Sequence, residues 1–161
     1  MRGMRLHRHR RLVGLAALGA AALAAFVLAY FEPQKLLIDD RVAEALPATA
    51  AVKTLSVGTF RSYEHATSGR ARVIATAGGR RYVRFEDFET SNGPALKVYL
   101  SAAPASGPGD SFDDRFVDLG DLKGNIGSQN YTIPARVRLD RYRSVVVWCK
   151  RFSVPFAAAP L

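Results

Sequence analysis

The sequence contains a single cysteine, Cys149, which stands beside the only tryptophan in the apolar stretch VVVWCKRF (145–152). A thiol among valines acts as a small hydrophobic residue, and burial raises its pKa and makes the sulfur inert. Two cations, Lys150 and Arg151, follow it directly, and nearby positive charge favours the reactive thiolate. The residues alone therefore leave open both a structural cysteine and a redox thiol.

The chemistry available to a lone thiol is bounded. It can pass through sulfenic acid, pair with a thiol of a partner protein, or serve as an axial ligand to haem iron. It cannot exchange two electrons as a dithiol does. With one cysteine the chain also lacks the C-x-x-C-H signature of covalent haem attachment. Haem held without such a covalent link stays a candidate cofactor.

His65 is the one histidine beyond the N-terminal segment. Its imidazole could lower the thiol pKa as a base, or act as a second haem ligand. The alternative is a solvent-facing or capping histidine beside the turn at Ser68 and Gly69. Because Cys149 and His65 supply two ligands where a structural zinc site needs four, we predict no metal site.

Aromatic residues are numerous, and most are expected in the core. Trp148 and Tyr131 are the two that we expect beside a flat cofactor or sugar, if one binds. No serine-histidine-aspartate arrangement is recognisable, which disfavours an independent hydrolase.

One acidic stretch and two glycine-containing stretches could be mistaken for ion-binding loops, but each is better interpreted as an ordinary loop or turn. Calcium loops have a D-x-D-x-D-G order and a closing glutamate, which the acidic stretch lacks, so a solvated loop is favoured. The stretches SNGP (91–94) and KGNIG (123–127) do not open helices, so they predict turns and not phosphate sites. The acidic residues are Asp110, Asp113, Asp114, Asp118 and Asp121.

From Leu55 onward the sequence consists of short apolar runs separated by glycine and proline. This pattern predicts that β-strands position the residues named above. The pair Gly78-Gly79 predicts a tight hairpin between strands at 72–77 and 81–85. Alternation over 96–101 predicts a strand with one buried face. Further strands are predicted at 55–60, 115–119, 131–133, 137–139, 144–150 and 152–156.

In the strand at 144–150, Cys149 shares a face with Val145 and Val147, while Trp148 and Lys150 point to the other face, which we expect to meet solvent. Seven to nine strands in the 107 residues from Leu55 predict an all-β fold, an antiparallel β-sandwich or small barrel. A chain of this size can bury a core without disulfides.

Residues 12–31 carry no charged side chain, and twenty helical residues span about 30 Å, the thickness of the bilayer's hydrocarbon core. Arginines crowd the preceding tail, 1–11, so the positive-inside rule predicts a cytoplasmic N terminus and an extracytoplasmic domain, 52–161. The alternative is a cleaved signal peptide, but the apolar segment exceeds the usual length of about 7 to 15 residues. We therefore expect a single-pass anchor in the cell membrane, with the lipid bilayer as its partner.

The connector, 32–51, is predicted to be either a plain tether or a short amphipathic helix near the membrane. After Phe31 the chain has 18 Lys and Arg against 14 Asp and Glu, so much of its net charge of +9 belongs to the basic tail. Because the orientation of the helix in the membrane explains the excess of positive charge in the tail, we expect no nucleic acid partner.

Six pieces of sequence carry a family resemblance: GTF (58–60), His65, SG (68–69), FEDFETSNGPALKVYLS (85–101), DLGDLKGNIGSQNYTIP (118–134) and YRSVVVWCKRFSVPF (142–156). In this order they resemble the DM-thirteen (DM13) domain family of small all-β, electron-transfer modules, and the chain looks like a membrane-anchored, bacterial-type member. The resemblance implies that Cys149 is the redox residue.

Two functional hypotheses follow. The first is a membrane-anchored redox accessory module that uses Cys149, with a redox partner protein and with haem as a candidate prosthetic group. The second is an extracytoplasmic binding or adhesion module in which Cys149 is part of the core.

Overall fold

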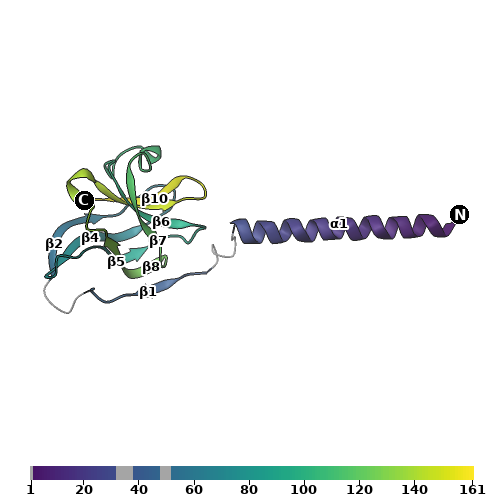
Figure 1. The fold of residues 1–161 in the computed structure, drawn as a ribbon, viewed down its shortest axis with the longest axis horizontal. Coiled ribbons are helices and arrows are strands. Elements are labelled where there is room, and N and C mark those ends of the chain that lie inside the picture. Colours follow the sequence, from purple (N-terminus) through teal and green to yellow (C-terminus); the bar gives the residue numbers. More distant parts are fainter. Residues whose placement is uncertain (1, 32–37, 48–51) are drawn as a thin grey trace. The chain divides into compact units, whose positions relative to one another are not determined.

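A computed structural model describes residues 2–31, 38–47 and 52–161. The chain divides into two units, Met1–Gln34 and Lys35–Leu161. The first contains helix α1 (Arg2–Phe31), whose segment Val13–Tyr30 has a mean hydropathy of 2.2 (Figure 1). By length and composition this helix could span a membrane or serve as a signal sequence.

The second unit is a sandwich of two five-stranded sheets (Figure 1). The first sheet has the order β1 (Arg41–Ala43), β8 (Ile126–Ile133), β5 (Arg81–Glu89), β4 (Ser68–Thr76) and β2 (Val52–Thr59). The second has the order β3 (Arg61–Ser62), β10 (Val154–Pro160), β9 (Ser144–Cys149), β6 (Leu96–Ser101) and β7 (Phe116–Asp121). The predicted all-β, sandwich-like fold is confirmed.

The ladders are antiparallel except for one. The hairpin predicted at Gly78-Gly79 joins β4 and β5, and Gly79 has the positive φ of 77° that such a turn requires. The exception is β1, which pairs with β8 in parallel. A Cβ atom at Gly127 of β8 would lie 2.0 Å from the carbonyl oxygen of Val42, so the close approach of β1 requires glycine at this position.

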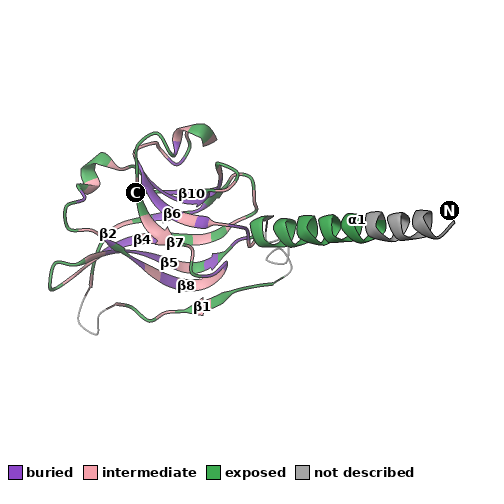
Figure 2. Cartoon of the chain, turned by 45° about the vertical axis from the view of Figure 1, so that its right-hand side comes forward, coloured by how far each residue is buried: buried purple, intermediate pink, exposed green. Residues whose placement is uncertain are grey.

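The main core lies between the two sheets, and strands of both sheets carry buried residues, coloured purple in Figure 2. The core includes the side chains of Val73, Val83, Phe85, Val98, Val147 and Cys149. Alternation along β9 thus places Cys149 with Val145 and Val147, as predicted.

The outer face of the second sheet differs from the prediction. Tyr99 and Trp148 are buried there, with Val146, against Phe112 of the segment between β6 and β7. A short 3-10 turn, η2 (Gly109–Ser111), lies within this segment. Both faces of β6 and β9 are therefore covered, whereas the sequence pattern predicted one solvent-facing side. Lys150 is exposed, as expected.

Two predicted strands are wrong, one in its existence and one in where it begins. Residues 137–139 form no strand, because Val137 closes a turn onto Pro134 and a 3-10 turn, η3 (Leu139–Arg141), follows. The Arg81 guanidinium holds this turn by donating to the carbonyls of Pro134, Ala135 and Val137. The last strand begins at Val154 and not at Phe152, because residues 150–153 form the β9–β10 turn.

The described part of the connector, residues 38–47, contains strand β1 and not the amphipathic helix considered above. Its polar groups explain this difference: the Glu44 carboxylate accepts from the Asn130 backbone N–H at 2.7 Å and from Lys123 Nζ at 2.7 Å. We call residues 38–47 the strap. Residues 32–37 and 48–51 of the predicted connector lie outside the described residues.

Candidate functional site: a covered thiol at one end of the sandwich

Cys149 is the last residue of β9 and is fully buried. Its ladder partners are Leu96 on β6 and Val154 on β10, at the end of the second sheet where both neighbouring strands begin. The Sγ atom donates to the backbone carbonyl of Pro94 at 3.3 Å. Within the described part of the chain, this is the one polar contact of the sulfur.

A short segment, residues 91–95, leads into β6 and supplies the carbonyl that the sulfur meets. We call it the cover loop. Gly93 and Pro94 are buried, and the backbone N–H of Lys150 donates to the Ala95 carbonyl at 3.1 Å, which ties the loop to the turn after Cys149. The sulfur therefore lies beneath a few residues of irregular backbone at the edge of the core.

The strap fastens the cover loop from outside. The Asn92 side-chain amide donates to the Ile38 carbonyl at 3.1 Å and to an Asp40 carboxylate oxygen at 3.0 Å. The buried side chain of Asn125 adds to this junction, because its Oδ1 accepts from the Asp40 N–H and its Nδ2 donates to the Asp39 carboxylate. The strap thus holds the loop that covers the thiol.

Two non-glycine residues on either side of Cys149 have left-handed backbone geometry. Ala95, in the cover loop, has a φ of 55°, and Ser153, in the β9–β10 turn, has a φ of 52°. A side chain in this region costs about 1–2 kcal/mol, and such residues cluster at functional and switching segments. The cover loop therefore contains one strained residue, Ala95, and the turn that follows Cys149 contains another, Ser153.

His65 does not contact the thiol. Its ring stacks on Phe156 with 3.8 Å between the centroids, and the far edge of the Phe156 ring packs against Gly93 of the cover loop. The imidazole is half-buried and lies against the edge of the core. The ring is thus held in a stack at the edge of the core, a position that the sequence did not suggest, since the alternative considered there was a solvent-facing or capping histidine.

Trp148 and Tyr131 lie on different surfaces of the two sheets. Trp148 is on the outer face of the second sheet, 6.2 Å from the Tyr99 ring, and Tyr99 in turn stacks on half-exposed Phe116 at 4.2 Å. Tyr131 faces the main core, where its hydroxyl donates to Gln129 Oε1 and accepts from the Lys123 N–H at 3.1 Å. Burial raises the Tyr131 pKa above its usual value.

These positions do not fit a haem bound between Cys149 and His65. The sulfur is buried in the core and hydrogen-bonded to the Pro94 carbonyl. The His65 imidazole stacks on the Phe156 ring. Trp148 and Tyr131, predicted beside a cofactor, do not line the cavity described below, and neither do Cys149 and His65.

Two aspartates of the acidic stretch, Asp118 and Asp121, form ion pairs within the second sheet. Lys97 Nζ lies 2.6 Å from an Asp121 oxygen and 3.8 Å from Asp118, and the hydrogen bond with Asp121 raises the Lys97 pKa. Among the residues that the structure describes, no three His, Cys, Asp or Glu side chains are grouped to hold a metal ion.

Sequence reasoning missed the polar residues that secure the cover loop. In the sequence Asn92 and Asn125 belong only to turn-forming stretches, yet each joins segments far apart in the chain. Their signal was an asparagine beside glycine in the pieces SNGP and KGNIG. Nothing in either piece indicates that the partner is the strap.

These features define a small β-sandwich domain with one sequestered cysteine at the end of a central strand. Residues 59–161 match the family described as electron transfer DM13. Because the match covers more than half of the chain, the chain belongs to this family, which suggests a redox-related role. No curated protein and no solved structure matches it.

Proposed function

We propose that the protein is a membrane-anchored, extracytoplasmic redox module in which Cys149 is the reacting thiol. Family membership supports the redox role. The anchor is supported by the apolar helix segment Val13–Tyr30, and the orientation by the arginines of the preceding tail. The bilayer and a redox partner protein are then its two partners.

The observation that carries this proposal is the strained cover over a solitary thiol. A structural cysteine needs no such cover, since any apolar neighbour would bury it, whereas Ala95 and Ser153 hold costly backbone geometry on both sides of Cys149. Opening of residues 91–95 alone would expose the sulfur without separating the sheets. Local openings of this kind cost less free energy than global unfolding.

The exposed thiol would react with a disulfide of the partner protein. It first loses its proton to water, and the thiolate sulfur then bonds to one partner sulfur while the partner S–S bond breaks and the second sulfur leaves as a thiolate. Cys149 becomes half of a mixed disulfide, and the partner sulfur that leaves keeps the electron pair of the broken S–S bond. No second cysteine of this chain takes part.

The alternative is a binding or adhesion module in which Cys149 is a core residue. The burial of Cys149 and the hydrogen bond from its Sγ to the Pro94 carbonyl favour this alternative. The two functions differ in one measurable property, namely whether the native protein exposes the sulfur more often than it unfolds.

Native-state thiol labelling tests the proposal. The full chain in detergent micelles is exposed to a maleimide over a range of denaturant concentrations, with Cys149→Ser as the blank, and global unfolding is followed separately by tryptophan fluorescence. We expect labelling in water to be much faster than global unfolding allows, with a weak dependence on denaturant. Labelling that proceeds only through global unfolding would refute the redox thiol and leave the binding module.

A further inference from the structure

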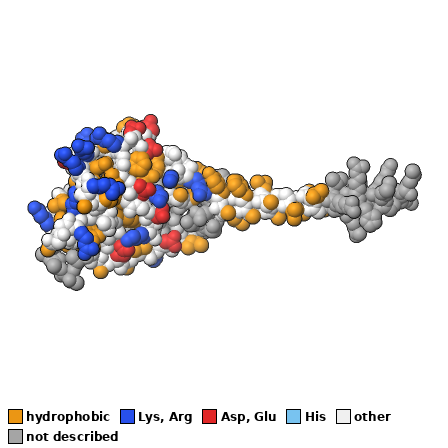
Figure 3. Space-filling view, in the orientation of Figure 1, with side chains coloured by type: hydrophobic (Ala, Val, Ile, Leu, Met, Phe, Trp, Pro, Cys, Tyr) orange, Lys and Arg blue, Asp and Glu red, His pale blue; other side chains and the backbone are white. Residues whose placement is uncertain are grey.

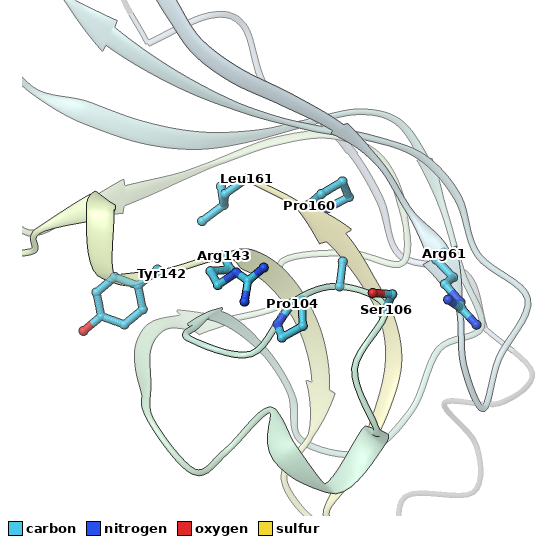
Figure 4. Close-up of a pocket in the computed structure, with 8 residues that line it drawn as sticks. Arg61, Pro104, Ser106, Tyr142, Arg143, Pro160 and Leu161 are labelled. Atoms are coloured by element: carbon cyan, nitrogen blue, oxygen red, sulfur yellow. The ribbon is translucent and has the colours of Figure 1, made fainter.

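A cavity opens at the opposite end of the second sheet from Cys149, with a volume of about 490 Å³. It lies where β9 begins and β10 ends, and the β6–β7 segment forms one wall (Figure 4). Its lining combines two guanidinium groups, from Arg61 and Arg143, with the apolar surfaces of Pro104, Pro160 and Leu161 and the hydroxyl of Ser106.

The walls are fixed by hydrogen bonds, so the cavity is already formed. The Tyr63 hydroxyl bonds to the carbonyls of Ala105 and Gly107 at 2.8 and 2.7 Å, and this contact clamps one wall to the strand that carries Arg61. The Ser144 hydroxyl donates to Ala103 at 2.7 Å on the other side. A preformed cavity with apolar walls and a few polar groups is the usual form of a small-molecule site.

The cavity is also lined by two cationic side chains. No acidic side chain lines it, and within the described residues no Asp or Glu forms an ion pair with Arg143 or Arg61. In Figure 4 the Arg143 side chain lies among the lining residues, between Leu161 and Pro104. The Arg61 guanidinium, at the rim, packs over the Tyr63 ring at 5.7 Å.

The surrounding surface strengthens this field. Figure 3 shows Lys and Arg side chains gathered over the end of the β unit where the C terminus lies. Arg136, Arg138 and Arg141 lie on the chain just before Arg143, and only Arg138 has an acidic partner, Asp140, among the described residues. An anion that approaches this end therefore meets a focused positive potential.

We propose that this cavity binds a small organic anion, one that carries a carboxylate or phosphate group on an apolar body. The acidic group pairs with the Arg143 guanidinium, whose planar fork matches two anionic oxygens. The apolar body lies against Pro104, Pro160 and Leu161. A simple inorganic anion makes the first contact but not the second, so it binds more weakly.

Calorimetric titration of the full chain in detergent micelles tests this site. The probes are naphthoate, its uncharged amide naphthamide, and inorganic phosphate. We expect naphthoate to bind tightest, and Arg143→Gln to weaken it by about tenfold, since a charge-assisted pair is lost. Arg136→Gln is the matched control, because Arg136 is exposed at the same end but does not line the cavity, and its change should stay within about twofold.

Arg143→Lys should give an intermediate affinity, because the charge stays while the forked geometry is lost. Equal affinities for naphthoate and naphthamide would overturn the proposal, and so would equal effects of Arg143→Gln and Arg136→Gln. Arg143 is exposed, so its replacement should leave the melting temperature unchanged, which a thermal scan verifies. Cys149→Ser should leave naphthoate affinity unchanged, so this test and the thiol test fail or succeed separately.

Discussion

Replacement of Asn92 by alanine should open the cover loop and expose Cys149. In the closed state the Asn92 amide donates two hydrogen bonds to the strap, to the Ile38 carbonyl and the Asp40 carboxylate. Each such bond contributes about 0.5–1.5 kcal/mol net, and Asn92 is only half-buried, so we expect a loss of about 1–2 kcal/mol. This corresponds to a roughly 5- to 30-fold rise in the open population.

The assay is the rate of maleimide labelling of Cys149 in the native state. When opening and closing are fast compared with labelling, the rate is proportional to the open population, so it should rise by the same factor of roughly 5 to 30. Global stability, measured by denaturant titration, should fall by no more than the same free energy.

Asn130→Ala is the matched control. The Asn130 amide also donates two bonds to the strap, to the Ala45 carbonyl at 2.8 Å and to Glu44 at 3.2 Å, and its Oδ1 accepts from the buried Arg84 guanidinium at 2.9 Å. These strap residues follow β1, whereas Asn92 holds residues that precede it. We expect a loss of stability at least as large as for Asn92→Ala, with labelling changed by less than about threefold, because segments of a protein open locally as separate units. If Asn92→Ala and Asn130→Ala accelerate labelling equally, exposure follows general destabilisation, and the inference that Asn92 latches a local cover is wrong.

Two further predictions concern Ala95 and Tyr131. Ala95→Gly should slow native-state labelling of Cys149 by a few fold, because glycine adopts the φ of 55° without the penalty of about 1–2 kcal/mol. The greater conformational freedom of glycine in the open loop offsets part of this gain. Unchanged or faster labelling would show that backbone strain does not drive opening. Because the folded pKa of Tyr131 is raised, its contribution to stability is fully present below the unfolded value of about 10 and is lost as the pH rises toward the folded value. Denaturant titrations at increasing alkaline pH should therefore show a steeper loss of stability for the native chain than for Tyr131→Phe, and parallel curves would contradict the assigned burial.

Local sequence patterns predicted the frame of the fold and the orientation of the thiol. Gly78-Gly79 fixed a hairpin because a tight turn needs positive φ, and period-two alternation put Cys149 with Val145 and Val147. Both signals come from neighbouring residues, so they needed no knowledge of distant contacts.

What surrounds the thiol was not predictable in the same way. The burial of Trp148 depends on Phe112, and the latch on the cover loop joins Asn92 to Asp40 across 52 positions of sequence. The helix considered for the connector failed for a similar reason, since the parallel pairing of β1 with β8 satisfies its backbone instead. Pairing between distant polar groups leaves no periodic trace in the sequence, so only the three-dimensional arrangement reveals it.

The two proposed sites occupy opposite ends of one strand, which constrains how they can be related. Strand β9 begins at Ser144, next to Arg143 of the cavity, and ends at Cys149. Six residue steps from Arg143 to Cys149, at roughly 3.3 Å each, separate the two positions by about 20 Å, and the valines of β9 between them are fully buried. A small anion held by Arg143 therefore cannot be the group that reacts with the sulfur. If the anion influences the thiol at all, it must act through the stability of β9 and its neighbours, and in that case naphthoate would slow labelling of Cys149 as it raises the melting temperature.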